Sequence, residues 1–395
     1  MINLKTAGIV CEYNPLHNGH IYHISETRKS GATHIVCVMS GNYVQRGECA
    51  FVDKWTRAEA AIDNGADLVV ELPTPWSCDS AENFAFGALW ILNALNIDML
   101  SFGSETDDIE LLKKCASVDD GALSDFVLKY IKQGNSYPFS FKKTVLETYG
   151  EKVAEVISSP NSTLAVEYLK AISKINGNIE PFPVSRKGCV HDSLSTDGEF
   201  ISASAIRNSD DISTVRNYIP EDEFLKIKKL FENEYAPCLT DNAERAIISA
   251  LRLSSPADLS KYADNDRGLC ERICSASKSC MNLTELYKTV KTKNITMAKI
   301  RRSVMRFYLD IEADISKKAP PYIKVLAANE KGLEVLKKSK GNLPVVTKHS
   351  DAAKLDSFGK YVYEKECRCT DLYALFSKKI RACGLEQTSS AKIIK

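Results

Sequence analysis

Two histidines near the start of the chain have a spacing that suits binding of a nucleoside triphosphate. His17 and His20 flank Gly19 in the segment AGIVCEYNPLHNGHIYH, residues 7 to 23. Imidazole nitrogens can donate hydrogen bonds to phosphate oxygens, and glycine removes the side chain where a phosphate must approach the backbone. The pattern predicts that both rings converge on the phosphates of ATP and stabilise negative charge there.

The residues around the histidines predict a strand that ends in a turn and leads into a helix. Residues 7 to 11 form a short apolar run, Asn14 and Pro15 interrupt it, and a helix is expected from residue 19 to about residue 30. A helix N-terminus offers unpaired N–H groups and a positive dipole end to an anion. Surface histidines near a turn are one alternative, and zinc ligands are a weaker one because the chain has no HExxH motif or suitably spaced cysteine pair.

Short apolar, largely β-branched runs separated by helical stretches predict an α/β fold in the first half. Strands are expected at about residues 6–11, 34–39, 67–71 and 97–102, with a further strand within residues 178–188. This rhythm implies parallel strands, whose carboxyl ends carry the ligand-binding loops. The His17 turn, the segment at residues 40–47, Pro73 and Gly103 each follow one of these strands, so we expect them to meet at one edge of the sheet.

A second phosphate-binding element is predicted at ISASAIR, residues 201–207. Ser202 and Ser204 supply hydroxyls at a helix start and Arg207 supplies a cation, so together they could hold the β and γ phosphates. The alternative is an ordinary helix cap, since Ser-Ala-Ser before a helix is common.

Several segments together resemble one family. The His-x-Gly-His turn resembles the signature of the nucleotidylyltransferase superfamily, and the stretches at residues 39–73, 101–105, 159–169 and 184–188 narrow the resemblance to the bacterial tRNA(Met) cytidine acetate ligases. The resemblance implies a Rossmann-like nucleotidylyltransferase domain with a parallel sheet at residues 1–215, with a helical insertion at about residues 106–175. A mainly helical, basic tRNA-binding region with a small α/β element is implied at residues 216–395.

The resemblance also implies which residues bind ATP. The matching positions are Val10, Cys11, Glu12, Tyr13, Asn14, Pro15, Leu16, His17, Asn18, Gly19, His20, Ile21, Tyr22, His23, Gly103, Asn161 and Arg186. Among them, His17 and His20 are expected to be catalytic. Asn161 could instead cap a helix, Gly103 could be a turn residue, and Arg186 could form a surface salt bridge.

The activity implied by the resemblance has two chemical steps. Acetate attacks the α-phosphorus of ATP to give acetyl-adenylate and pyrophosphate, and the exocyclic amine of the wobble cytidine in elongator tRNA(Met) then takes the acetyl group. Mg²⁺ is expected with the triphosphate, although no dedicated metal site is expected in the chain, and coenzyme A is not required. Two alternatives remain: a small-molecule adenylyltransferase of the pantetheine-phosphate or nicotinate-nucleotide type, and a non-catalytic nucleotide-dependent RNA-binding protein.

Positive charge is concentrated in the last third of the chain. The formal net charge is only +1, but residues 281–350 contain 15 Lys and Arg against 6 Asp and Glu. Such a surface could hold an RNA backbone, with a solvated helix face as the alternative. The cations expected to contact tRNA are Arg46, Lys54, Arg57, Lys299, Arg301, Arg302 and Arg306. For Arg46, Lys54 and Arg57, contact with phosphate is the alternative.

Composition favours a cytoplasmic protein. The chain has no stretch of eighteen apolar residues and no secretory signal, and most of its 13 cysteines are scattered singly, as is typical of reduced thiols. We therefore expect no membrane partner, and the sequence leaves the oligomeric state open. Residues 387–395 are expected to be frayed.

Overall fold

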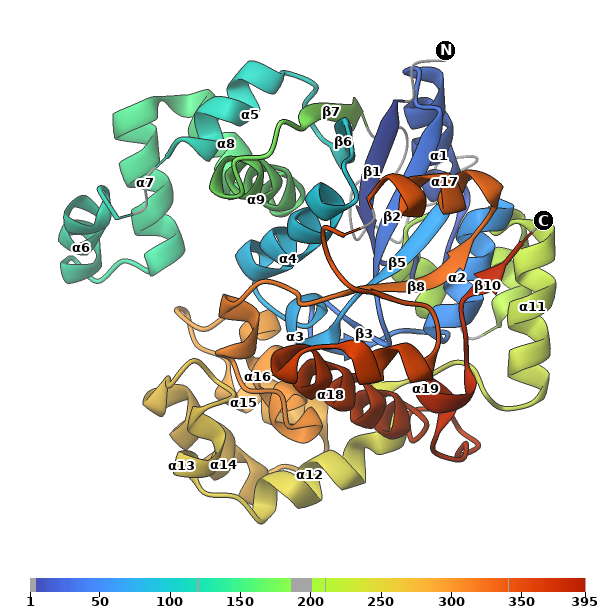
Figure 1. Cartoon of the computed structure of the whole chain (residues 1–395). Helices are drawn as coiled ribbons and strands as arrows, with labels where there is room; N and C mark the ends of the chain where they lie inside the picture. Colours follow the sequence, from blue (N-terminus) through green and yellow to red (C-terminus); the bar gives the residue numbers. More distant parts are fainter. Residues whose placement is uncertain (1–4, 119–120, 186–200, 210, 340, 395) are drawn as a thin grey trace.

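An eight-stranded sheet forms the centre of the molecule (Figure 1). The structure, a computed structural model, describes residues 5–118, 121–185, 201–209, 211–339 and 341–394. The strand order is β10-β8-β5-β2-β1-β6-β7, and β9 pairs with β8. The strands are β1 (Thr6–Cys11), β2 (His34–Ser40), β5 (Leu68–Leu72), β6 (Met99–Ser104), β7 (Glu180–Ser185), β8 (Ile323–Ala328), β9 (Val345–Val346) and β10 (Lys392–Ile393).

The strands of the first half lie where the apolar runs predicted them. β1, β2, β5, β6 and β7 are parallel, with Cys11 opposite Met39 and Ser40 opposite Leu72. Every residue of β2 and β5 is buried, as expected for parallel strands covered on both faces. The predicted α/β fold is confirmed, and the strand ends that carry the predicted loops share one edge of the sheet.

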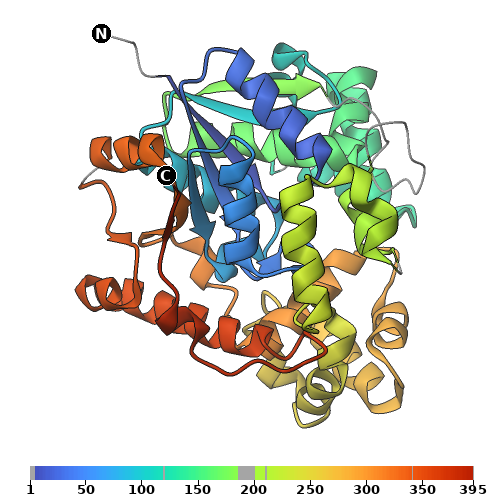
Figure 2. The same ribbon diagram turned by 90° about the vertical axis from the view of Figure 1, so that its right-hand side faces the viewer.

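Helices cover both faces of the sheet. Successive residues of β2 alternate between two cores, since Ile35 and Cys37 pack with α1 (Asn18–Lys29) and α2 (Lys54–Asp63), whereas Val36 and Val38 pack with α4 (Ala81–Ala94) and α9 (Pro160–Lys174). Figure 2 shows α1 and α2 in front of the sheet, with α11 (Glu221–Glu232) beside them. Short elements at the carboxyl edge are the hairpin of β3 (Tyr43–Val44) and β4 (Glu48–Cys49), α3 (Thr74–Ser77) and α10 (Ala203–Arg207).

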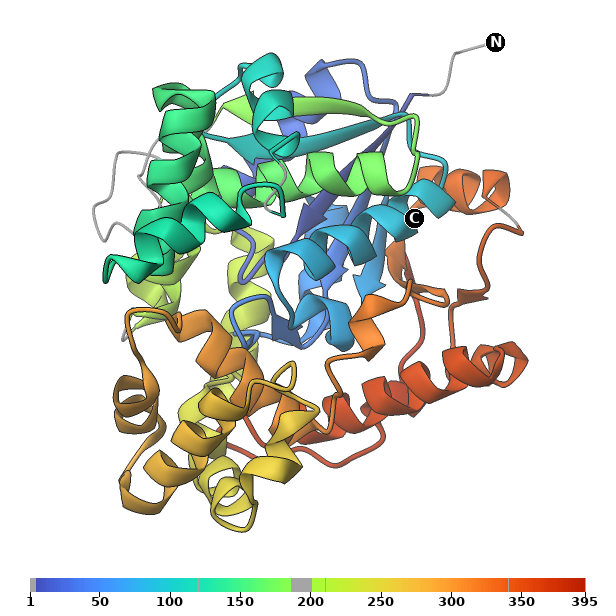
Figure 3. The ribbon, with the colours of Figure 1, turned by 90° about the vertical axis from the view of Figure 1, so that its left-hand side faces the viewer.

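Four helices form an arm that projects from one side of the sheet (Figures 1 and 3). They are α5 (Ile109–Ala116), α6 (Ser124–Lys132), α7 (Tyr137–Tyr149) and α8 (Glu151–Ser158). Val127, Val145 and Val153 belong to a small core of the arm, separate from the cores of the sheet. The helix that follows, α9, packs against α4, so the projecting part of the predicted insertion ends at Ser158.

The last third of the chain contributes strands to the same sheet. β8 pairs antiparallel with β5, and β10 pairs parallel with β8. The small α/β element predicted here is present, with α17 (Glu330–Lys338) between β8 and β9. The prediction of a frayed end is wrong for Lys392 and Ile393, because these residues form β10 and the N–H of Ile394 donates to the carbonyl of Ala328 at 2.9 Å. The division of the chain at residue 215 stays a prediction, although the sheet draws strands from both sides of it.

The other C-terminal helices lie below the carboxyl edge of the sheet in Figure 1. They are α12 (Glu244–Arg252), α13 (Pro256–Ser260), α14 (Arg267–Ser279), α15 (Leu283–Val290), α16 (Met297–Leu309), α18 (Ser357–Tyr373) and α19 (Leu385–Thr388). Within the described parts of the chain, no helix is both long and apolar enough to span a membrane.

Candidate active site

His17 and His20 lie together at the start of α1. His17 is the N-cap residue, and its Nδ1 accepts a hydrogen bond from the N–H of Gly19 at 3.1 Å. The N–H of His17 in turn donates to Nδ1 of His20 at 3.3 Å. The two rings stack with their centroids 3.8 Å apart, and Tyr13 packs edge-on against His20. The spacing of the two histidines therefore brings their rings together as predicted.

These capping bonds determine which ring nitrogen carries the proton. Because Nδ1 accepts a backbone N–H in both His17 and His20, each neutral ring carries its proton on Nε2. Each Nε2–H is a donor on the edge of the ring away from the cap. The positive end of the α1 dipole lies at the same turn, so the turn suits a polyanion.

The turn between β1 and α1 is held by residues from other elements. Tyr13 has a φ of 43°, and the peptide bond after Asn14 is cis. Asn14 Oδ1 accepts a hydrogen bond from the N–H of Phe51 at 2.7 Å, and the Asn14 carbonyl accepts one from Arg207 at 2.7 Å. The phosphate-binding element predicted at residues 201–207 thus lies against the histidine turn. Ser202 is the N-cap of α10, and its Oγ lies 3.0 Å from that of Ser204.

Arg57 supports this turn from inside the protein. Its side chain is fully buried, and its guanidinium donates to the carbonyl oxygens of Glu12 at 2.6 Å, Ser40 at 3.1 Å, Val52 at 2.9 Å and Gly41. Burial lowers the pKa of Arg57 from its usual value. The prediction that Arg57 contacts tRNA is wrong, because the side chain joins the loops after β1 and β2 and has no exposed surface.

Lys54 and Arg306 are also buried and paired. Lys54 Nζ lies 2.7 Å from Glu71 Oε1 and 2.9 Å from Glu386 Oε2, and Arg306 pairs with Asp79. The exposed fractions of Lys54 and Arg306 are 0% and 2%. Removing a charge from a buried pair costs about 3–5 kcal/mol, so neither cation is available to RNA. These two predicted tRNA contacts are corrected to structural ion pairs.

Other predicted RNA contacts gather around the β3–β4 hairpin. Arg46 is exposed at the tip of the hairpin. Arg301 pairs with Glu48, and its guanidinium lies 5.8 Å from the ring centroid of Tyr287. Arg302 is half-buried, and burial lowers its pKa. Arg46, Arg301 and Arg302 therefore lie near the edge of the sheet, and the charge of Arg301 is compensated by Glu48.

Part of the positive charge of residues 281–350, the basic segment, is neutralised by acids elsewhere in the protein. Lys299 Nζ lies 2.7 Å from Asp266 Oδ2, an acid from outside the segment. By contrast, Lys288, Lys291 and Lys293 are exposed and follow one another at the end of α15. Fewer of the cations at residues 281–350 are therefore available to RNA than the excess of Lys and Arg in this segment predicts.

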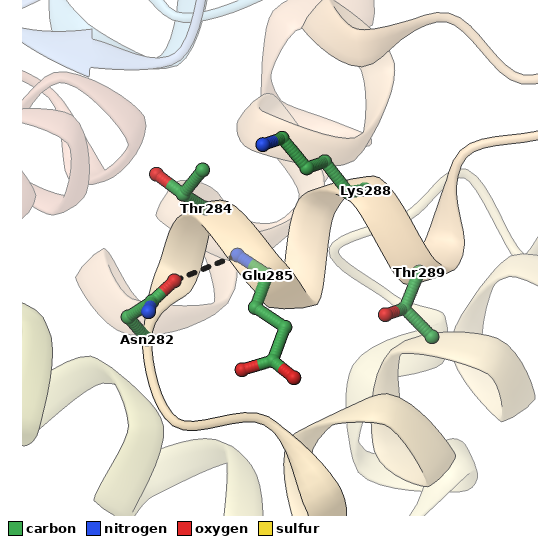
Figure 4. A pocket seen from close by; sticks show the side chains of 5 residues that line it. All are labelled: Asn282, Thr284, Glu285, Lys288 and Thr289. Carbon is green, nitrogen blue, oxygen red and sulfur yellow. Dashed lines mark hydrogen bonds between the residues drawn. The ribbon is translucent and has the colours of Figure 1, made fainter.

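A shallow hollow lies along α15 (Figure 4). It is lined by Asn282, Thr284, Glu285, Lys288 and Thr289. Asn282 Oδ1 accepts a hydrogen bond from the N–H of Glu285 at 2.8 Å, so that amide caps the helix. The hollow contains none of the predicted ATP-binding residues, and its lining carries the carboxylate of Glu285 as well as the ammonium of Lys288.

The remaining predicted ATP-binding residues of the first segment line the end of β1 and the start of α1. Val10 and Cys11 close the strand, and burial and the neighbouring Cys37 raise the pKa of the Cys11 thiol. Leu16 is fully buried, and Asn18 donates to the carbonyl of Asn217 at 3.1 Å. Pro15, Ile21 and Tyr22 occupy the same turn and helix.

Three predicted ATP-binding residues lie further along the chain, and the structure describes two of them. Gly103 lies within β6, opposite Val184, rather than after the strand. Asn161 lies in the first turn of α9, which begins at Pro160, and Arg186 lies outside the described residues.

Sequence reasoning missed Ser101 as a partner of the site. His23 Nε2 lies 2.9 Å from Ser101 Oγ, which joins α1 to β6. A signal was available, because a hydroxyl inside an otherwise apolar strand needs a partner when it is buried.

Comparisons with known proteins identify the family. The family model described as HIGH Nucleotidyl Transferase matches residues 4–388. The tRNA(Met) cytidine acetate ligase of Alkaliphilus metalliredigens (strain QYMF) is 35% identical, and the alignment covers 95% of both chains. The chain belongs to the tRNA(Met) cytidine acetate ligase family. The member from Thermoanaerobacter sp. (strain X514) is 37% identical over 96% of this chain and 97% of its own.

Solved structures of a family member have the same fold along the whole chain. Thermotoga maritima TmcAL without ligand superposes with a TM-score of 0.91 at 30% identity, covering 99% of this chain and all of that one. TmcAL bound with alpha-thio ATP gives a TM-score of 0.89 at 29% identity. Family membership makes this protein an enzyme of the ligase class.

Proposed function

We propose that this protein is an ATP-dependent ligase that acetylates the wobble cytidine of elongator tRNA(Met) in the cytoplasm. The observation that carries the proposal is the capped pair of His17 and His20 at the carboxyl edge of the sheet, in a chain that matches the named ligases over nearly its full length. Acetate and ATP are the proposed small substrates. Coenzyme A has no place in this reaction, because ATP activates the acetate.

The first step needs positioned donors rather than a protein nucleophile. An acetate oxygen forms a bond to the α-phosphorus of ATP, and the bond to the β,γ-pyrophosphate breaks with its electron pair leaving on pyrophosphate. The Nε2–H groups of His17 and His20 are proposed to donate to the phosphates as charge develops. Ser202, Ser204 and Arg207 are proposed to hold the β and γ phosphates, which is supported by the bond from Arg207 to the carbonyl of Asn14.

The rest of the nucleotide is proposed to lie along the strand ends, against residues 10–13 and Gly103, with Asn161 and Arg186 as further contacts. Mg²⁺ on the triphosphate would neutralise phosphate charge and needs few protein ligands. The described residues contain no group of three His, Cys, Asp or Glu side chains arranged to hold a metal ion, so no protein ligand is assigned to it.

In the second step the cytidine amine attacks the acetyl carbon, AMP leaves with the electron pair, and the amine loses a proton. The tRNA must therefore reach the carboxyl edge of the sheet. We propose that Arg46 and the exposed row of Lys288, Lys291 and Lys293 contact its backbone. Lys288 also lines the hollow on α15.

The decisive experiment follows labelled acetate into tRNA. The protein is incubated with ATP, labelled acetate and tRNA, and the nucleosides are analysed by mass spectrometry. Acetylated cytidine together with acetate-dependent exchange of pyrophosphate into ATP is the expected result. Transfer of AMP to pantetheine phosphate or to a nicotinate nucleotide would instead establish an adenylyltransferase. RNA binding with neither product would establish a non-catalytic protein.

His20 can be tested without removing its capping role. In His20→Asn the amide oxygen can still accept from the N–H of His17, but the donor on the far side of the ring is lost. We expect pyrophosphate exchange to fall about 10²- to 10³-fold, the usual effect of losing one donor to developing charge, with tRNA affinity within about twofold. His349→Ala, which removes an exposed histidine outside the site, is the control. Equal losses of exchange and tRNA affinity would contradict the proposed role.

A further inference from the structure

The outward face of the helical arm combines exposed aromatic and apolar side chains with lysines. On α7, Phe139, Lys142, Lys143 and Leu146 are exposed and follow the 3, 4, 7 spacing that places residues on one side of a helix. Phe139 is 52% exposed and Leu146 is 43% exposed. The buried side of α7 packs through Val145 into the small core of the arm, whereas the exposed Phe139 and Leu146 lie outside that core.

Tyr130 joins this stripe to α6. The Nζ of Lys143 lies 4.6 Å from the centroid of the Tyr130 ring, and the Nζ of Lys129 lies 6.0 Å from the same ring. Phe126, one helical turn before Lys129, is 60% exposed. Lysines from two helices therefore gather around one aromatic ring, with a large exposed phenylalanine on each helix.

The charge of the two helices is positive. α6 and α7 carry four lysines at positions 129, 132, 142 and 143, against the acids Asp125 and Glu147. Both oxygens of Glu147 accept from the Tyr130 hydroxyl, at 2.6 and 2.7 Å. The Tyr130 ring is itself buried, but exposed phenylalanines and lysines on one surface suit single-stranded nucleic acid, in which phosphates need cations and unpaired bases need a surface for stacking. A second copy of the same face is disfavoured because like charges would meet.

The arm begins and ends at the carboxyl edge of the sheet. It follows β6, which contains Gly103, and it returns to the sheet at α9. Ser159 Oγ, at the start of α9, donates to the Glu105 carboxylate just after β6 at 2.5 Å, so the two ends of the arm are joined. We propose that this arm face, defined by Phe126, Lys129, Phe139, Lys142, Lys143 and Leu146, binds the unpaired anticodon loop of the tRNA. This inference rests on the proposed function, which supplies the tRNA as substrate.

The test uses the full chain with three residues of α7 replaced together, Phe139→Ala with Lys142→Gln and Lys143→Gln. Binding of a fluorescent anticodon stem-loop RNA is measured by anisotropy across a range of salt concentrations. We expect the affinity to fall at least tenfold, and the slope of log K against log salt to become shallower by about 1.4 to 1.8 for two lost phosphate contacts. Acetate-dependent pyrophosphate exchange without tRNA should stay unchanged, because the arm face does not touch the ATP site.

A matched control lies on α17, which covers another part of the sheet (Figure 1). Leu333→Ala with Lys337→Gln and Lys338→Gln removes one exposed apolar side chain and two exposed lysines at similar spacing. An equal loss of RNA affinity in both variants would overturn the inference, as would no loss in the α7 variant. Two other results would also overturn it: loss of self-association only in the α7 variant, or loss only of binding to anionic vesicles. Absence of pyrophosphate exchange in the unaltered protein would instead refute the proposed function, while RNA binding would still test the arm face.

Discussion

Glu223 of α11 is a carboxyl group buried in an unfavourable environment. It is 1% exposed, and within the described parts of the chain neither of its oxygens has a hydrogen-bond partner. Burial raises the pKa of Glu223 to about 8, and nearby Asp53 adds to this rise, whereas Lys226 opposes it. The neutral acid is therefore the form that the folded protein holds at neutral pH.

This raised pKa makes stability fall as pH rises. Below about pH 4.5 Glu223 is protonated in both states, but between about pH 4.5 and 8 only the unfolded chain releases the proton, so the unfolded state is increasingly favoured. We expect Glu223→Gln to raise the free energy of unfolding on the order of 2–4 kcal/mol at pH 8 and to leave it nearly unchanged at pH 4.5. Urea denaturation at the two pH values measures the difference. The exposed Glu232→Gln on the same helix is the control, and the same pH profile in both variants would refute the assignment.

Residue type and spacing revealed the histidine turn, but they could not reveal burial. His17 and His20 can be identified from the sequence because their rings come together through local spacing along one turn. Lys54, Arg57 and Arg306 were misassigned because their partners are residues and carbonyl groups distant in sequence. A lysine in sequence is an expected surface residue, and only the fold shows that Lys54 meets Glu71 and Glu386 in the interior.

At the scale of elements, the β3–β4 hairpin is docked on α16 through one glycine. Gly47 has a φ of 78°, and a Cβ at this position would lie 2.5 Å from the backbone nitrogen of Arg302. Arg301, its neighbour on α16, pairs with Glu48 of the hairpin. The close approach therefore fixes where Arg46, at the tip of the hairpin, lies.

Gly47→Ala should push the hairpin away from α16. We expect a loss of about 2–3 kcal/mol in the free energy of unfolding, since the methyl group meets backbone atoms and the left-handed conformation is strained as well. Gly31→Ala is the matched control because Gly31 has a φ of 96° but no atom within 4 Å of an added Cβ, so it measures the strain alone at about 1 kcal/mol. Chemical denaturation measures both variants. Equal losses in the two variants would show that the close approach to α16 does not contribute to the free energy of unfolding.

Elements defined by local patterns were predictable, whereas their long-range pairing was not. The apolar runs at residues 6–11 and 34–39 locate β1 and β2 because a buried parallel strand needs such a run. The run at β8 predicts a strand equally well, but nothing local states that it pairs antiparallel with β5, about 250 residues earlier. For the same reason β10 was mistaken for a frayed end.

Across the whole molecule, buried charges join the two ends of the chain. Glu71 of β5 and Glu386 of α19 share the ammonium of Lys54, and Lys324 of β8 pairs with the same two carboxylates. Burial lowers the pKa of Lys324 to about 7, and burial raises that of the neighbouring Glu366 to about 7. The sheet and the C-terminal helices therefore share one buried ionic cluster as well as one set of strands.

This sharing predicts that the chain unfolds as one unit although its sequence suggested two parts. All three tryptophans lie in the first hundred residues, and Cys383 is an exposed thiol near the end. Tryptophan fluorescence and a label on Cys383 therefore report the two parts separately. We expect both probes to give one midpoint in urea. Lys54→Met should lower that midpoint for both probes together and reduce the free energy of unfolding by about 3–5 kcal/mol, because it removes one of the two cations that compensate the buried carboxylates of Glu71 and Glu386. Lys29→Met, which breaks an exposed pair with Glu26, should cost less than about 1 kcal/mol. Two separate midpoints would contradict this prediction, as would an effect of Lys54→Met that is confined to the tryptophan signal. Either result would mean that the C-terminal helices unfold independently of the sheet, although the last third of the chain supplies β8 and β10 to that sheet.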